Sequence, residues 1–231
     1  MLMFFFSLLY ADVSGDILQA SNTSLEESVR QEAFARLVRE GNADAEPLFA
    51  IAKDESAEIQ QRWIAIRALG KVGGKKLVQD LSPLLQDKKS EVRIAACSAL
   101  GDTRLWSATS FLIPLLEDQV LLVRVAAAQS LGVITNPEAV EPLEKALRAS
   151  THFHRGKSLW VRSHFVEALG KIRSKKAYPA LLYAIDDQDE SVFQAAIVAL
   201  EQITGFALSE GRNRQEERQA WKRWLAKELA K

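Results

Sequence analysis

The segment VRIAACSALG, at residues 92–101, decides the fold of this chain, because the sequence repeats it. The six related copies are VRQEAFARLV (29–38), QRWIAIRALG (61–70), VRIAACSALG (92–101), VRVAAAQSLG (123–132), VRSHFVEALG (161–170) and VFQAAIVALE (192–201). Their first residues are separated by 32, 31, 31, 38 and 31 residues. A fixed period of this length indicates a repeat architecture in which each repeat packs on its neighbours. The period is interrupted once, between the fourth and fifth copies.

Each copy predicts an amphipathic helix. In the third copy the apolar residues are Val92, Ala95, Ala96, Ala99 and Leu100, which is the spacing of one helical face. The small alanines on this face allow neighbouring helices to approach closely. A glycine closes four of the copies, as Gly70, Gly101, Gly132 and Gly170. We predict that this glycine is the left-handed residue just past the helix end.

A second amphipathic stretch lies between successive copies. These stretches are residues 77–87, 109–118, 139–147 and 177–187, and each has a proline, as Pro83, Pro114, Pro142 or Pro179. Pro83 and Pro114 lie deep enough to kink their helices. Ser24 to Glu27 has the pattern of a capping box that opens the first repeated helix. Each repeat therefore predicts two antiparallel helices, and their stacking predicts an all-α, right-handed α-solenoid of about six helical hairpins.

The repeat resembles a known family in its residues as well as its spacing. The residues that carry the resemblance are Leu112, Asp118, Val123, Arg124, Ala127, Ser130, Leu131 and Gly132. Together they are similar to the HEAT-like repeat of the short bacterial type, named after the phycobilisome lyases. The resemblance covers about residues 25–205 and implies the solenoid fold. Repeats of this type serve scaffolds, lyases and DNA-repair proteins, so the resemblance alone does not select a function.

The sequence divides into three segments. Residues 1–11 are nearly all apolar, residues 12–205 form the solenoid with an insertion at 150–157, and residues 206–231 carry no repeat motif. We predict that 206–231 is a capping segment, whose Trp221 and Trp224 lie on one helical face and seal the last repeat. A polar outer face on such a terminal segment keeps a solenoid soluble.

The apolar run from Leu2 to Tyr10 has two interpretations. It is far shorter than the roughly 20 residues that a membrane-spanning helix needs, so no stable membrane span is expected. Its length suits a signal-peptide core cleaved after Ala11, which predicts export to the periplasm or the medium. The basic residues of a signal peptide are missing, as they would be if the start codon were placed too far downstream. The alternative is a hydrophobic flap over the first repeat of a cytoplasmic protein.

Composition disfavours several classes of function. Thirty basic residues balance thirty acidic ones, and a formal charge of zero does not favour nucleic-acid binding. Cys97 is the single cysteine, so an intrachain disulfide and a thiolate zinc site are excluded. We find no nucleophile elbow and no phosphate-binding loop with Walker spacing. We therefore expect no catalytic residues and no cofactor.

An arginine recurs at the second position of the repeat. The series is Arg30, Arg62, Arg93, Arg124 and Arg162, and Asp87 and Asp118 precede Arg93 and Arg124 by six residues. One interpretation is a stripe that grips phosphates or acidic tails. The other, which the family resemblance implies and the paired aspartates support, is an internal Asp–Arg ladder. In it each guanidinium bridges a turn in its own or the neighbouring repeat. We predict the ladder.

The three histidines are His152, His154 and His164. Two of them flank Phe153 and the third follows ten residues later, a pattern that admits a metal site with imidazole ligands. His164, however, lies on the repeated helix at a position where other copies have alanine. No Asp, Glu or Cys lies close in sequence to His152 and His154 to complete a ligand set. We predict a packing role for His164 and no metal site.

The interruption of the period predicts the partner-binding surface. The residues just before the repeated helix are polar in other copies, but they are apolar in the fourth and fifth copies. The inserted loop adds an aromatic residue nearby. These candidate residues are Val120, Leu121, Leu122, Phe153, Leu159 and Trp160. Exposed apolar clusters with an aromatic anchor are favoured protein-binding sites. The alternative is that the inserted loop folds back and covers them.

The predicted function is that of a non-enzymatic scaffold or adaptor that binds a protein or a peptide. One alternative is a lyase or maturation factor of the phycobilisome-lyase type, acting on a chromophore or a protein substrate. The other is a repeat protein that binds nucleic acid, which would require a continuous basic groove.

Overall fold

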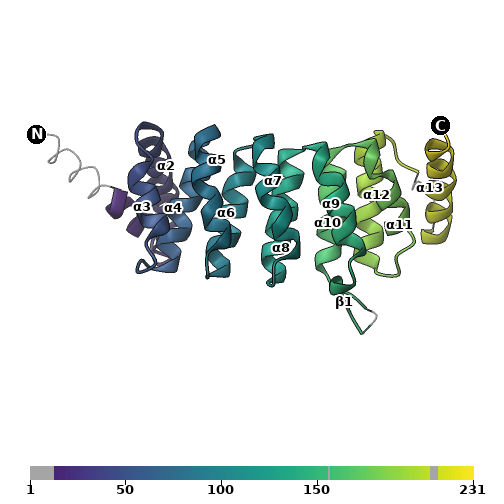
Figure 1. Ribbon diagram of the computed structural model, residues 1–231, viewed down its shortest axis with the longest axis horizontal. Coiled ribbons are helices and arrows are strands. Elements are labelled where there is room, and N and C mark those ends of the chain that lie inside the picture. The colour runs from purple at the N-terminus through teal and green to yellow at the C-terminus, as the bar shows by residue number, and fades with distance from the viewer. Residues whose placement is uncertain (1–12, 156, 209–212) are drawn as a thin grey trace, which may run out of the picture. The chain divides into compact units, whose positions relative to one another are not determined.

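The computed structural model describes residues 13–155, 157–208 and 213–231. Residues 1–11, with their predicted signal core or flap, therefore lie outside the described residues. The chain packs as two compact units, Met1–Ala108 (unit 1) and Thr109–Lys231 (unit 2). In both units helices follow one another as antiparallel pairs, so the fold is the all-α repeat solenoid that the period predicts (Figure 1).

Unit 1 contains three helical hairpins among its described residues. The first pairs residues 13–21 with α2 (Glu27–Ala43), and the second pairs α3 (Glu46–Lys53) with α4 (Ile59–Val72). The third pairs α5 (Lys75–Leu81) and the 3-10 helix η1 (Ser82–Gln86) with α6 (Ser90–Asp102), and the 3-10 turn η2 (Trp106–Ala108) follows. In each pair the second helix carries the repeated sequence.

Unit 2 contains three further hairpins and a terminal helix. The first pairs α7 (Thr109–Leu112) and η3 (Ile113–Glu117) with α8 (Leu121–Ile134). The second pairs η4 (Pro137–Ala139) and α9 (Val140–Arg148) with α10 (Val161–Ile172), and η5 (Ser150–His152), β1 (Phe153–His154) and β2 (Lys157–Ser158) lie between them. The third pairs η6 (Lys175–Ala177) and α11 (Tyr178–Ala184) with α12 (Glu190–Thr204), and α13 (Arg214–Leu229) ends the chain.

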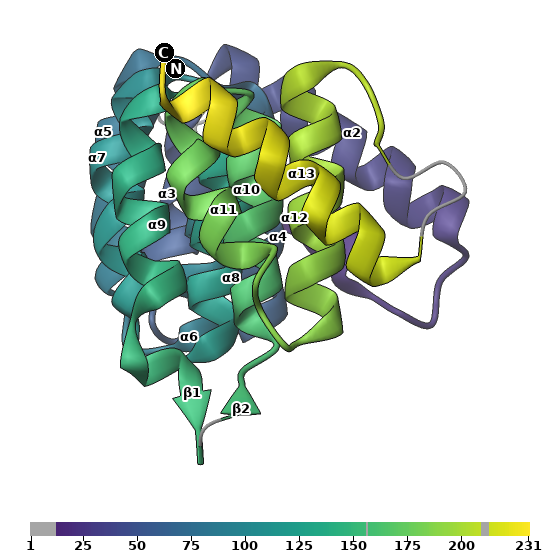
Figure 2. The same ribbon diagram turned by 90° about the vertical axis from the view of Figure 1, so that its right-hand side faces the viewer.

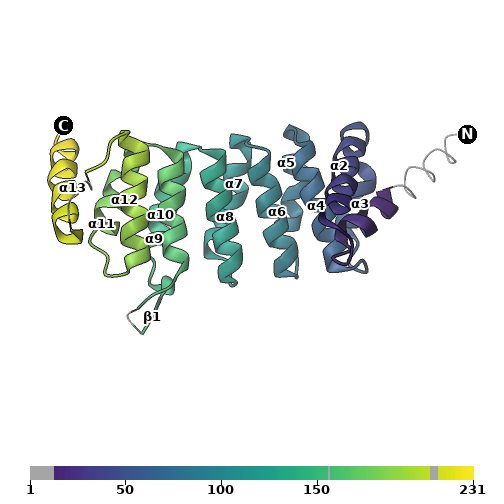
Figure 3. The same ribbon diagram turned by 180° about the vertical axis from the view of Figure 1, so that it is seen from behind.

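The repeated helices pack directly on one another through their small residues. In unit 1 α4 lies beside α6, and in unit 2 α8, α10 and α12 lie side by side (Figure 3). A Cβ placed on Gly70 would lie 2.5 Å from the Cα of Ala99, and one placed on Gly170 would lie 2.8 Å from the Cα of Ala199. Glycine is therefore required at these two positions, because any side chain would collide with the backbone of the neighbouring helix.

The prediction that the closing glycine caps the helix was wrong. Helix α4 continues past Gly70 to Val72, and α8 continues past Gly132 to Ile134. The residues with positive φ come later, at Gly73 after α4 and at Thr135 after α8. The packing requirement, rather than the backbone conformation, selects glycine at the closing position of the repeat.

Two other local predictions have different outcomes. Pro83 and Pro114 each change the helix from α to 3-10, because a proline inside a helix cannot donate the α-helical hydrogen bond. The predicted capping box at Ser24 was wrong, since α2 begins at Glu27 and the Ser24 hydroxyl donates to the side chain of Asn22. A capping box does open α13, where Asn213 and Glu216 bond reciprocally.

The last helix packs on the final hairpin through aromatic residues (Figure 2). Trp221 is fully buried and stacks on Phe206, with 5.6 Å between the ring centroids. Trp224 lies edge-on to Tyr178 of α11 at 5.4 Å. Both tryptophans thus face the solenoid and cover its last apolar surface.

Two of the repeated arginines form buried ion pairs with an aspartate of the following hairpin. The guanidinium of Arg62 donates to Asp87 at 2.6 Å and to the carbonyl of Ala52 at 2.9 Å. Burial disfavours the charge of Asp87, but the bond from Arg62 and one from the Lys89 backbone outweigh burial and lower its pKa. The partner of Arg62 lies 25 residues ahead, in the next hairpin, which is the neighbouring repeat.

The same offset joins Arg162 to Asp187, whose nearest nitrogen and oxygen atoms are 2.7 Å apart. Arg93 and Arg124 also bond to the aspartate six residues behind, but through its backbone carbonyl. The ladder therefore has two kinds of bond. A local bond joins the guanidinium to a turn carbonyl, and a second bond reaches a carboxylate in the next hairpin.

Among the described residues, Arg124 has no bond of the second kind. The position 25 residues after it is Ala149, which ends α9 with nearly the same backbone angles as Asp87 at the end of η1. The Nη1 atom of Arg124 is buried without a hydrogen-bond partner among the described residues. The ladder is therefore interrupted at Arg124, directly before the inserted segment. The unpaired donor lowers stability, because a buried N–H without an acceptor loses its bond to water and gains none in the protein.

Replacing Gly70 by alanine tests the close approach of the repeated helices. Gly70→Ala should lower the free energy of unfolding by about 1–3 kcal/mol, because its Cβ would collide with the backbone at Ala99. Gly15→Ala is the matched control, since a Cβ at Gly15 has no atom within 4 Å. Urea denaturation of both variants would measure the difference. Equal stability of the two variants would contradict the packing role.

Restoring the missing carboxylate tests the ladder. Ala149→Asp should raise the free energy of unfolding by about 1–2 kcal/mol at neutral pH, by pairing with Arg124. Arg124 should lower the pKa of the new carboxyl in the folded protein. The gain should therefore be complete above the unfolded pKa of about 3.9, and it should be lost as the pH falls from there through the lower folded pKa. Thermal denaturation at pH 7 and pH 3 would measure this, with Ala149→Asn as the neutral control. An equal effect of Asn and Asp would refute the pairing.

Candidate functional site

The inserted segment folds into a short hairpin at the N-terminal end of α10. Strands β1 and β2 are antiparallel, with Phe153 opposite Ser158 and His154 opposite Lys157. The backbone N–H of Leu159 donates to the carbonyl of His152 at 2.9 Å, which closes the base of the hairpin. The hairpin extends beyond the ends of the helices of unit 2 (Figure 2).

His152 fixes the base of this hairpin in the core. Its ring is fully buried and lies edge-on to Phe165, with 4.9 Å between the centroids. Its Nδ1 lies 2.8 Å from the carbonyl oxygen of Ala146 and must carry the proton of that bond, because a carbonyl can only accept. Burial lowers the pKa of His152, and the nearby charges of Arg124 and Arg162 lower it further. The ring is therefore neutral and serves as an anchor.

Two large apolar side chains remain exposed beside the hairpin. Leu122 is 57% exposed and Trp160 is 48% exposed, whereas Val120, Leu121 and Leu159 are half-buried. Leu122 and Trp160 each precede the valine that opens the repeated sequence, so they occupy equivalent positions at the start of α8 and α10. Because these helices pack side by side, both residues belong to the same edge of unit 2. The inserted loop does not cover this apolar edge, which comprises Val120, Leu121, Leu122, Leu159 and Trp160.

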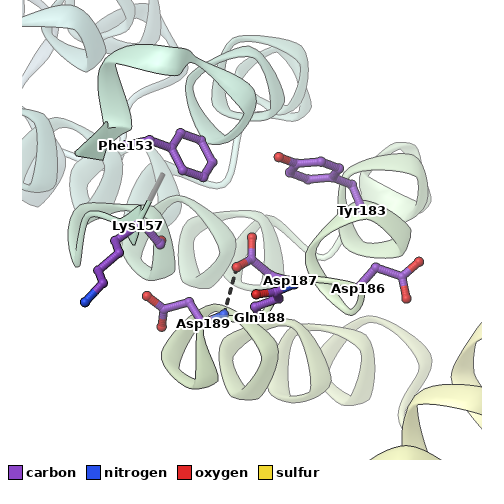
Figure 4. Close-up of a pocket in the computed structure, with 8 residues that line it drawn as sticks. Phe153, Lys157, Tyr183, Asp186, Asp187, Gln188 and Asp189 are labelled. Carbon is purple, nitrogen blue, oxygen red and sulfur yellow. Dashed lines mark hydrogen bonds between the residues drawn. The ribbon is translucent and has the colours of Figure 1, made fainter. Parts of the chain in front are cut away.

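Phe153, the sixth candidate, lies elsewhere. Its ring contacts the guanidinium of Arg162, whose central carbon lies 4.2 Å from the ring centroid. Phe153 lines a cleft of about 620 Å³ together with Tyr183 of α11 and the turn before α12 (Figure 4). Neither Leu122 nor Trp160 lines this cleft. The structure therefore divides the predicted patch between two surfaces.

Acidic side chains form the opposite wall of the cleft, and two of them are neutralised by the protein itself. Asp187 pairs with Arg162 and also accepts the backbone N–H of Asp189 at 2.9 Å, as the dashed line in Figure 4 shows. Asp186 pairs with Lys222 of α13 at 2.6 Å. Asp189 accepts the backbone N–H of Ser191 and caps α12. Asp187 and Asp186 therefore join the last hairpin to α10 and to α13.

The histidines do not converge. Nδ1 of His164 bonds to Glu167 at 3.0 Å, and its ring lies edge-on to Trp160 at 5.6 Å. His154 is exposed on the hairpin, whereas His152 is buried. Across the described ranges, no three His, Cys, Asp or Glu side chains are grouped as ligands for a metal ion. No helix among those residues is long and apolar enough to cross a membrane.

Several residues of these surfaces were not found from the sequence. Tyr183 lines the cleft, and its ring face lies 4.2 Å from the guanidinium of Arg148. Asp187 could have been found by searching 25 residues after each repeated arginine, as could the alanine at position 149. No sequence signal shows that Phe153 turns toward Arg162, because that depends on the fold of the hairpin.

The comparisons with known proteins agree with this architecture. The family model for HEAT repeats matches residues 45–120, 90–159 and 153–210. A solved structure of the complex of CpcE and CpcF of phycocyanin lyase from Nostoc sp. PCC7120 is similar, with 26% sequence identity and a TM-score of 0.60. The alignment covers 81% of this chain and 70% of that chain.

A designed armadillo repeat protein, solved in complex with the peptide (KR)4, has 23% identity and a TM-score of 0.50. That alignment covers 82% of this chain and 98% of the designed one, and it shows likeness of fold alone. The comparison with curated proteins gives no match. Since the HEAT-repeat model matches more than half of the sequence, this chain belongs to the HEAT-repeat family.

Proposed function

We propose that this chain is a non-enzymatic scaffold, and that a protein partner docks on the apolar edge of unit 2. The observation that carries the proposal is the joint exposure of Leu122 and Trp160 at equivalent positions of two adjacent helices. Tryptophan is enriched among the residues that dominate binding energies, because its large side chain buries much apolar surface.

The other repeats show that the fold does not require apolar side chains at these positions. The equivalent residues are Gln60 before the second copy, Glu91 before the third and Ser191 before the sixth, and all three are exposed. A polar residue therefore suffices at the start of the repeated helix. Two apolar residues in adjacent repeats are better explained by contact with a partner than by stability.

The half-buried residues of the edge support this interpretation. Val120, Leu121 and Leu159 surround the two exposed side chains with further apolar surface. Trp160 is held against His164, so its orientation is partly fixed before any partner binds. An aromatic anchor that is already oriented loses less conformational entropy on binding.

A second candidate function is that of a lyase subunit. Its support is the 26% identity to a chain in the complex of CpcE and CpcF of phycocyanin lyase. Under this alternative the apolar edge would contact a second repeat chain. A change in the visible absorption of phycocyanin, produced by less than one equivalent of this chain, would favour the lyase. A stoichiometric complex without a spectral change would favour the scaffold.

The proposed edge can be tested with a photo-crosslinking amino acid at position 160. It should crosslink one discrete protein in native cells, and the purified pair can then be studied by calorimetry. Trp160→Ala with Leu122→Ser should weaken that complex by about 100-fold, because two central apolar contacts are lost. The melting temperature should stay nearly unchanged, since both side chains are already exposed in the free protein.

Trp106 offers a matched control, because it is a 61% exposed tryptophan in unit 1. Trp106→Ala should leave the affinity unchanged, and a crosslinker at position 106 should not capture the same protein. The proposal fails if the double variant binds normally. It also fails if the double variant melts many degrees lower, which would place the edge in the core.

A further inference from the structure

Unit 1 contains a cleft that the proposed scaffold function does not use. It has a volume of about 330 Å³ and lies among residues 13–21, α2, α4 and the start of α6. Ala20, Ile59, Trp63 and Ile64 form its apolar wall, and among the residues that the structure describes Arg30 is the one cationic residue that lines it. A volume near the lower end of the range for ligand sites suits one small apolar group.

Arg30 is the first of the repeated arginines, and it lacks the carboxylate that Arg62 and Arg162 have. The residue 25 positions ahead is Glu55, which is exposed and pairs with Lys88 at 3.2 Å. Its neighbour Asp54 accepts the backbone N–H and the hydroxyl of Ser56, at 2.8 and 2.6 Å. Neither acidic group forms an ion pair with Arg30 among the described residues.

The guanidinium of Arg30 is consequently short of acceptors. Its Nε atom is buried and has no hydrogen-bond partner within the described part of the chain. An unpaired buried donor costs about 1–3 kcal/mol, and a guanidinium presents its donors in a fork that matches a carboxylate. In Arg62 the Nε atom bonds to the carbonyl of Ala52, and Nη2 bonds to Asp87. An incoming carboxylate would supply to the Nη groups of Arg30 the acceptor that Asp87 supplies to Nη2 of Arg62.

We propose that this cleft binds an apolar group that carries one carboxylate, with Arg30 contacting the carboxylate and Trp63 the apolar part. The same chemistry is presented by a free aliphatic acid and by the C-terminal residue of a peptide. The site lies in unit 1 and is independent of the apolar edge of unit 2.

Glu91 restricts the ligand further. It lines the cleft, is exposed, and accepts a hydrogen bond from the Ser90 hydroxyl at 3.1 Å. Bonds to its own backbone and to Ser90 lower its pKa, so it is charged at neutral pH. Its negative charge opposes phosphates and dicarboxylates, which leaves a monoanion with an apolar body as the best match.

The test uses hexanoate and its neutral analogue hexanamide as probes of the full chain. Binding is followed by NMR shifts of the Ile59 and Ile64 methyl groups. Hexanoate should shift both residues with saturation below about 10 mM, as expected for so small a ligand, and hexanamide should bind at least about tenfold more weakly. A peptide ending in leucine, with a free or an amidated terminus, distinguishes a peptide source from a free acid.

Variants distinguish a direct contact of Arg30 with the carboxylate from a general effect of positive charge on α2. Arg30→Gln should weaken hexanoate binding by about tenfold or more, and Arg30→Lys by less, because lysine keeps the charge but loses the fork. Arg39→Gln, an exposed arginine of the same helix, should leave binding unchanged. Glu91→Gln should tighten binding a few-fold, because it removes the opposing charge.

Equal binding of the acid and the amide, no saturable shift with either, or normal binding by Arg30→Gln would each overturn the proposal. If Arg30→Gln does not fold, the other two variants test the proposal. Unchanged hexanoate binding by both Arg30→Lys and Glu91→Gln would then overturn it. Trp160→Ala should bind hexanoate as the wild type does. Failure of this site and failure of the apolar edge are therefore distinguishable.

Discussion

At the glycines of the repeat, neighbouring helices within each unit approach so closely that an added Cβ would collide with or crowd the next helix, and the rest of the arrangement depends on this contact. Gly70 faces the backbone at Ala99, and Gly132 faces that at Ala168. Each contact fixes both the separation and the register of two helices. Because register is fixed, an arginine near the start of one helix always lies opposite the same turn of the next hairpin. The constant offset between Arg62 and Asp87 follows from that geometry.

Where the residue at this offset forms no bond to the arginine, the repeat has departed from its own pattern. This happens after Arg124, where Ala149 precedes the inserted hairpin, and after Arg30, near the start of the described chain. A repeat is expected to keep its buried ion pairs, since one unpaired partner costs more than the intact pair contributes. Arg124 and Arg30 each keep one buried nitrogen that has no hydrogen-bond partner among the described residues, so they mark where the chain has given up an internal bond. One of them, Arg30, lines a cleft.

The sequence sufficed for the period, the helical hairpins and the family, because each follows from apolar spacing that recurs six times. It misled where a residue type has two physical uses. Glycine suits both a left-handed cap and a close helix contact, and only the packing at Gly70 distinguishes them. The sequence did not show which aspartate pairs with Arg62, because Asp87 lies 25 residues ahead and only the stacking of the next hairpin brings the two together. The exposure of Trp160 and the turn of Phe153 toward Arg162 depend on how one inserted loop folds, which no repeat pattern records.

A repeat protein can acquire such sites because each hairpin contacts only its neighbours. The inserted hairpin is anchored locally, by His152 against Phe165 and the carbonyl of Ala146, so its presence changes the ladder at Arg124 alone. The ion pair of Arg62 in unit 1 and that of Arg162 in unit 2 both persist. The unfavourable exposure of apolar surface at Leu122 and Trp160 is likewise confined to one edge of unit 2. Stability thus resides in the recurring contacts, and function can develop wherever a single repeat departs from them.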